Sequence, residues 1–377
     1  MKKLIKFFTA AVCGFALSSA FALDYGFLVD NNTSFRTKPN KEMYFFQQDS
    51  ASAWIKVPFG SSPDNYFVGE GLYKFEFNGN TNQVYHYLDL NLLKFVFINE
   101  LENGKLEADL GRFFVVDATG LIFTQNCDGA FVKYSNDFME VSGYAGYTGL
   151  LNGNTVTMIN SPSFKGNDAK QLYDFADRNV IAMVTGNFPF LFADQSVKVQ
   201  FAGAFRTDEI TYNRMYATLG MNGPIAGNLF YNIAGTAAFI SYNGKPVQVA
   251  PFVKADLVYY FPIASVGLNA VFAGNDFTGI TSQTALDSSY EPEYKGLLKT
   301  GLSAKVRPIN NLLISVSGDV AFDGSKNFEL KGAQYKVGAD YQVVSDVLIG
   351  ASWVQYFDIN KTDLDYQAVS IKAKIAF

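Results

Sequence analysis

The chain is poor in histidine and cysteine. Its 377 residues contain one histidine, His86, and two cysteines, Cys13 and Cys127. Cys13 lies in an apolar N-terminal segment, so removal of that segment would leave Cys127 without a disulfide partner. A transition-metal site of the usual kind needs several His or Cys ligands. We therefore expect no intramolecular disulfide, no metal, no other cofactor and no enzymatic activity.

The sequence also lacks long apolar runs after its first residues. No segment beyond residue 22 approaches the roughly 18 apolar residues that a transmembrane helix needs. Residues 1–22 have the form of a signal peptide: a basic start, an apolar run from Phe7 to Leu17, and then Ala20-Phe21-Ala22. We expect cleavage after Ala22 and export of residues 23–377.

Basic residues are outnumbered by acidic ones. The chain has 30 Lys and Arg against 35 Asp and Glu, and cleavage would remove Lys2, Lys3 and Lys6, giving a net charge of about −8. This balance argues against binding to nucleic acid or to anionic headgroups. Aromatic residues are abundant, at 16%, although the mean hydropathy is only +0.05. That combination fits strands that face lipid on one side and water on the other.

Apolar and polar residues alternate with a period of two along most of the chain. In the last segment, Tyr366 to Phe377, Val369 and Ile371 fall on one face and Lys372 and Lys374 on the other. Such alternation is typical of β-strands with one apolar and one polar face. The sequence therefore predicts an all-β fold.

The alternation divides the chain into about eighteen strands, or sixteen if residues 105–136 do not form a strand pair. The expected strands cover residues 23–35, 42–58, 65–78, 82–99, 105–116, 128–136, 138–150, 179–192, 196–207, 211–222, 228–243, 247–261, 266–275, 295–306, 311–322, 329–343, 347–359 and 364–377. Connections after even-numbered strands are short, and the two longest, 151–178 and 276–294, follow odd-numbered strands. This asymmetry predicts a transmembrane antiparallel up-and-down β-barrel over residues 23–377. A secreted β-sandwich would not account for it.

Two sequence features resemble outer-membrane β-barrel porins. The chain ends on Phe377, like the closing strand that the barrel-assembly machinery reads in that family. Gly111-Arg112-Phe113 and Asp128-Gly129 resemble the porin pattern of a strand ending in Gly-Arg, a loop, and Asp-Gly opening the next strand. The resemblance implies an outer-membrane location, with lipids and the assembly machinery as partners. Strict alternation from Leu110 would put Arg112 in lipid, so we expect a bulge at Gly111.

The positions that alternation turns inward carry many charges. We expect the pore to be lined by Arg112, Lys133, Lys198, Arg206, Arg214, Lys254, Asp256, Lys299, Lys305, Lys336, Asp340, Lys372 and Lys374. Acidic inward positions, such as Glu70 and Glu140, gather in the first half of the chain. Charged stripes of one sign bias which ions pass. The pattern predicts a mild anion preference; alternatively, the charges pair into a network that stiffens the barrel.

Two connections are candidates for narrowing the lumen. The apolar residues Leu121, Ile122 and Phe123 suggest a loop that folds against the inner wall or packs among other loops. Residues 168–178 could form a short helix, as a constriction or as an exposed loop. We expect a porin for passive diffusion of small hydrophilic solutes, able to form a homo-oligomer. The alternative is an adhesin or receptor with a blocked lumen.

Overall fold

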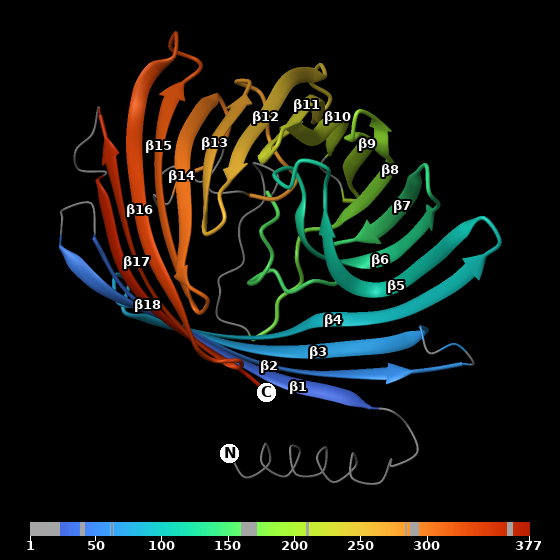
Figure 1. The fold of residues 1–377 in the computed structure, drawn as a ribbon, viewed down its shortest axis with the longest axis horizontal. Helices are drawn as coiled ribbons and strands as arrows, with labels where there is room; N and C mark the ends of the chain where they lie inside the picture. Colours follow the sequence, from blue (N-terminus) through green and yellow to red (C-terminus); the bar gives the residue numbers. More distant parts are fainter. Residues whose placement is uncertain are drawn as a thin grey trace.

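The strands close into a single barrel. The computed structural model describes residues 23–37, 42–60, 62, 64–159, 172–208, 211–282, 285–286, 294–359 and 365–377. Within these residues the chain forms one antiparallel sheet of eighteen strands (Figure 1). Strand β1 pairs with β18, from Leu28 opposite Ala376 to Arg36 opposite Ala368, so the sheet has no free edge. The predicted all-β, up-and-down barrel is confirmed, with eighteen strands rather than sixteen. The expected signal peptide lies outside the described residues.

Strand boundaries agree with the alternation in the sequence to within a few residues. The strands are β1 (Asp24–Thr37), β2 (Met43–Pro58), β3 (Tyr66–Asn78), β4 (Gln83–Leu101), β5 (Gly104–Val116), β6 (Thr124–Ser135), β7 (Glu140–Tyr147), β8 (Asn179–Phe192), β9 (Gln195–Arg206), β10 (Tyr212–Ala226), β11 (Leu229–Tyr242), β12 (Gln248–Tyr260), β13 (Ala264–Ala273), β14 (Leu297–Ile309), β15 (Leu312–Asp323), β16 (Glu329–Val344), β17 (Val347–Asp358) and β18 (Tyr366–Ala376). The described residues include no helix long and apolar enough to cross a membrane.

The two ends of the barrel differ in the length of their connections. At one end, the short-turn end, hairpins such as β4–β5 and β16–β17 are joined by only a few residues. At the other, the long-loop end, residues 148–178 join β7 to β8 and residues 274–296 join β13 to β14. Antiparallel neighbours need only a tight turn, so the long connections are not required for strand pairing and can serve another function.

The two faces of the sheet differ as the alternation predicts. On β9, Phe201 points outward with 61% of its surface exposed, while the neighbouring Gln200 and Ala202 are buried. Large apolar side chains stay exposed around the outside of the barrel, where they contact one another along the sheet, as Phe35 and Phe45 do, but no second layer of described residues covers them. The inner face carries the polar side chains and also supports a buried apolar cluster. That cluster includes residues from the long connections, among them Phe123, Met158 and Ile280.

Candidate functional site

The β5–β6 hairpin leaves the barrel wall at Arg112. Strand β4 pairs with β5 only from Leu93 opposite Arg112 to Leu101 opposite Gly104; beyond Arg112, β5 pairs with β6 alone. Gly111 has a φ of +122°, and a Cβ at this position would overlap the carbonyl oxygen of Leu93. Only glycine accepts this conformation readily, and it redirects the strand at the point where the hairpin departs.

The bulge expected at Gly111 is therefore wrong. The registers of β5 with both of its neighbours run without a shift. The irregularity lies in β4 instead, where Asn91 is skipped between the pairs of Gly71 with Leu90 and of Glu70 with Leu92. Glycine's positive φ turns β5 without the extra residue that a bulge would require.

Arg112 lies buried at this departure point. Its Nε and Nη2 donate to the two carboxylate oxygens of Asp128, each at 2.8 Å. Its Nη1 donates to Asp89 Oδ1 at 3.2 Å and to the Leu90 carbonyl at 3.1 Å, and Nη2 also donates to the Leu150 carbonyl at 2.8 Å. Charge-assisted bidentate bonds of this kind fix geometry strongly. Arg112 thus joins β4, β6 and the connection after β7 instead of projecting freely into the lumen.

The tip of the hairpin is ordered by one carboxylate. Asp117 Oδ1 accepts the amides of Ile122 and Phe123, both at 2.9 Å. Its Oδ2 accepts the amide and hydroxyl of Thr119 at 2.7 and 2.6 Å. These four bonds fold residues 117–123 into a compact turn and leave Ile122 and Phe123 buried.

This tip lies inside the barrel and bonds to strands β9 and β12 of the wall. The amide of Ala118 donates to Gln200 Oε1 on β9 at 2.8 Å. Lys254 Nζ on β12 donates to the Thr119 carbonyl at 3.2 Å. The structure therefore has the inward arrangement that the apolar loop residues suggested.

Two further segments extend the tip inside the barrel. Ile280 donates its amide to the Ile122 carbonyl at 2.7 Å, and Ile159 donates to the Ile280 carbonyl at 2.9 Å. We call residues 117–125, 156–159 and 277–282 the constriction segments. They come from three different connections at the long-loop end and share one apolar cluster with the wall.

The helix expected over residues 168–178 is wrong wherever it can be tested. Residues 168–171 lie outside the described residues, and residues 172–178 are not helical. Phe175 forms an antiparallel bridge with Asn152, and the Leu172 carbonyl accepts the amide of Leu88 on β4. These long-range bonds satisfy the backbone better than the single helical turn that local periodicity suggested.

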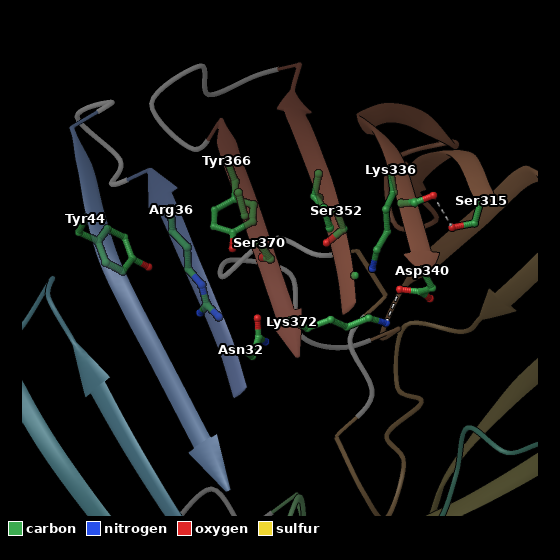
Figure 2. Close-up of a pocket in the computed structure, with 15 residues that line it drawn as sticks. Asn32, Arg36, Tyr44, Ser315, Lys336, Asp340, Ser352, Tyr366, Ser370 and Lys372 are labelled. Atoms are coloured by element: carbon green, nitrogen blue, oxygen red, sulfur yellow. Dashed lines mark hydrogen bonds and ion pairs between the residues drawn. The ribbon is translucent and has the colours of Figure 1, made fainter. Parts of the chain in front are cut away.

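A water-accessible cavity of about 610 Å³ lies along the wall formed by β1, β2 and β15–β18. Its charged lining residues are Arg36, Lys336, Lys372 and Asp340, and Figure 2 shows them among serine, tyrosine and asparagine side chains. Lys372 Nζ lies 2.8 Å from Asp340 Oδ1. Sequence reasoning missed Arg36, although it alternates in phase with the inward-facing Asn32 on β1.

Several of the expected lining residues are paired. Ion pairs join Lys133 to Glu107 (2.9 Å), Lys254 to Asp256 (3.5 Å), Lys299 to Asp319 (3.4 Å) and Arg206 to Asp177 (2.7 Å). Lys198, Lys305 and Lys374 share the inner phase of their strands and have no ion pair with any described residue. Among the described residues, the inner wall thus contains both ion pairs and lysines that have no acidic partner.

Asp177 lies in the connection just before β8, next to this network. Burial raises the pKa of its carboxyl, and the neighbouring Arg206 guanidinium opposes that shift. Arg206 also bonds Asp208 after β9, so it ties together two connections at the long-loop end.

A closed eighteen-strand barrel, apolar outside and charge-lined inside, is a porin-like fold. No protein-family model and no curated protein sequence matches the chain. Among solved structures, the chain is similar to OccAB4 of Acinetobacter baumannii (TM-score 0.64, 10% identity, 94% of this chain and 98% of that one). It is also similar to the outer membrane protein OprD of Pseudomonas aeruginosa (0.61, 11%, 94% and 93%). OccK2 of the same organism, solved with glucuronate, is similar as well (0.61, 12%, 96% and 99%).

Proposed function

We propose that the chain is an outer-membrane channel for passive passage of small hydrophilic solutes, with a mild preference for anions. The observation that carries this proposal is the cavity along β1, β2 and β15–β18. Three cations, Arg36, Lys336 and Lys372, line it against one carboxylate, Asp340. The similarity of the barrel to OprD and OccK2 supports the same reading.

The physical basis is a polar path through an apolar layer. A barrel of this strand number is wide enough to enclose water, and the water and lining side chains remove most of the cost of crossing lipid. Lysines that have no ion pair with a described residue, such as Lys198 and Lys305, would raise the local concentration of anions. The paired residues would hold the wall rigid. No step of this transport requires a cofactor or a catalytic group.

Solute uptake into proteoliposomes tests the proposal. Glucuronate is a suitable anionic probe, since OccK2 was solved with it, and glucose is a neutral probe of similar size. We expect both to enter, glucuronate faster. Lys336→Met combined with Lys372→Met should reduce the advantage of glucuronate, while Lys326→Met, in the exposed turn between β15 and β16, should not. Exclusion of both solutes would contradict the proposal.

The second candidate is a surface receptor or adhesin whose lumen is blocked. One observation favours it: the constriction segments bury Phe123, Ile122 and Ile280 inside the barrel almost completely. An apolar filling of this kind removes water from part of the lumen. A receptor would give no steady conductance in a planar bilayer, whereas a channel would.

The partners of the barrel are proposals as well. Outer-membrane lipids would cover the exposed apolar side chains, and copies of the chain could share that surface in a homo-oligomer. The assembly machinery would read β18. Phe377 pairs its amide and carbonyl with Phe27 on β1, yet 76% of the residue is exposed. Its aromatic side chain is thus accessible beside the closing seam.

A further inference from the structure

Arg214 occupies an unusual position inside the barrel. It lies on the inner face of β10, near the long-loop end, and none of its surface is exposed. Its Nη1 donates to three carbonyl oxygens: Gly279 at 2.8 Å, Ile159 at 3.1 Å and Ile280 at 3.4 Å. One guanidinium nitrogen therefore holds two constriction segments that belong to different connections.

The environment of Arg214 differs from that of the other buried arginines. Arg112 and Arg206 are paired with carboxylates, whereas Arg214 has no ion pair with any described residue. Its Nε and Nη2 have no hydrogen-bond partner within the part of the chain that the structure describes. Its Cζ also lies 4.5 Å from the centroid of the Tyr212 ring. Burying a charge without a carboxylate partner costs stability. The presence of an arginine at this position therefore requires an explanation other than stability alone.

The segment that Arg214 holds is itself hydrogen-bonded to the hairpin tip. The amides of Ile280 and Thr281 both donate to the Ile122 carbonyl, at 2.7 and 3.0 Å. Tyr216, the next inward residue of β10, donates its hydroxyl to the Thr278 carbonyl at 2.6 Å. The wall therefore holds residues 277–282 at two adjacent points, and these residues hold the tip.

Two other side chains of the wall bond only the hairpin tip and not the other two constriction segments. Gln200 and Lys254 each make one hydrogen bond to the tip itself. Neither bonds the segments 156–159 or 277–282. Arg214 is thus the described side chain that draws both of those segments to the wall.

We propose that Arg214 is a positioning residue that sets the width of the lumen by holding the constriction segments against β10. Nη1 lies one bond farther from Cα than the ammonium of a lysine would, and methionine has no donor at all. The inference rests on the proposed channel function, because the width of the lumen is measured by the ions and solutes that pass through it.

The test compares Arg214→Met, Arg214→Lys and Tyr216→Phe with the unmodified protein in planar bilayers and in swelling assays with neutral sugars of increasing size. We expect Arg214→Met to raise the single-channel conductance and to shift the sugar cutoff to larger molecules. Arg214→Lys should shift both in the same direction, because the lysine ammonium ends one bond closer to β10 than Nη1 and falls short of the carbonyl oxygens of Gly279 and Ile159. Tyr216→Phe, which loses one anchor, should give a smaller shift of the same sign.

Lys305→Met is the matched control. It removes an inner-wall cation that has no ion pair with a described residue and lies on β14, away from the constriction segments. This variant should alter ion selectivity and leave the sugar cutoff unchanged. Heat-modifiable migration on SDS gels reports whether each barrel is folded. If Arg214→Met does not fold, Tyr216→Phe decides the question.

Unchanged conductance and cutoff in folded Arg214→Met, or in Tyr216→Phe when that variant decides, would overturn the inference. So would an effect that Arg214→Lys fully reverses, since the charge would then be sufficient. If the unmodified protein shows no conductance, the channel proposal is contradicted, whatever the variants do. In that case, conductance in Arg214→Met would still support the role of Arg214 in setting the width of the lumen, and its absence would overturn that role.

Discussion

Arg112 and Asp128 face each other across the β5–β6 hairpin, joined by two parallel nitrogen–oxygen contacts of 2.8 Å each. The pair lies where the hairpin leaves the wall, and Arg112 also bonds Asp89 and the Leu90 carbonyl of β4. In the sequence the same two residues stand in the Gly-Arg and Asp-Gly pattern that resembles porins. Their geometry assigns that pattern a structural task, which is to fasten the base of a hairpin that folds into the lumen.

Removing this fastening should destabilise the barrel. In Arg112→Ala, Asp128 and Asp89 lose their buried partner, and we expect a loss of about 3–5 kcal/mol in the free energy of unfolding. Urea titration of the refolded barrel in lipid vesicles measures it. Lys105→Met, which removes an exposed ion pair with Glu100, should cost only about 0–1 kcal/mol. Equal effects of the two variants would show that the Arg112 cluster has no special role.

Gly111 should not tolerate a side chain. Its positive φ and the nearby Leu93 carbonyl predict that Gly111→Ala costs on the order of 1–3 kcal/mol. Gly71 on β3 is a suitable control, because nothing lies within 4 Å of a Cβ built there. Gly71→Ala should change stability by less than about 1 kcal/mol. The same urea titration compares them, and a neutral Gly111→Ala would refute the bend.

Asp117 should control the order of the hairpin tip. Asp117→Asn replaces one acceptor oxygen with a donor amide, so it cannot accept all four bonds from Thr119, Ile122 and Phe123. We expect faster hydrogen exchange at the amides of Ile122 and Phe123, with little change in the strands. Mass spectrometry of peptides covering residues 117–125 measures this. Unchanged protection in the variant would mean that the apolar packing alone orders the tip.

The terminal aromatic residue should matter for assembly more than for stability. Phe377→Asp keeps the backbone pairing with Phe27 but removes the exposed ring, so we expect less folded barrel in isolated membranes. Phe138→Asp is the matched control, because this equally exposed aromatic residue lies in the turn between β6 and β7. Quantitation of the heat-modifiable band distinguishes them. Equal yields from both variants would argue against recognition of the last strand.

The strands could be predicted from the sequence because their signal is local. A period of two is visible in each segment by itself, as in β18, where Ile371 and Lys372 point to opposite faces. The unequal connections then supplied the antiparallel order. β6 begins at Thr124 rather than at residue 128, since its first residues pair only with β5 inside the lumen.

The interior could be predicted only in part. Alternation put Arg112 on the lipid side, and the cost of a charge in lipid showed that the alternation must break near Gly111. Neither showed that Gly111 would turn the strand without a bulge. The helix expected over residues 168–178 is absent from the described residues 172–178, where Leu172 and Phe175 instead bond Leu88 and Asn152, which are distant in the sequence. The contacts of Arg214 with carbonyl oxygens leave no trace in side-chain patterns, since any residue supplies a carbonyl.

Single-channel recording of the purified protein in a planar bilayer under a KCl gradient shows whether the barrel conducts and which ion it prefers. We expect steady open steps and a reversal potential displaced toward the chloride equilibrium potential. Absence of steps from protein shown to be folded and inserted would contradict the channel, and a reversal potential near that of potassium would contradict the anion preference.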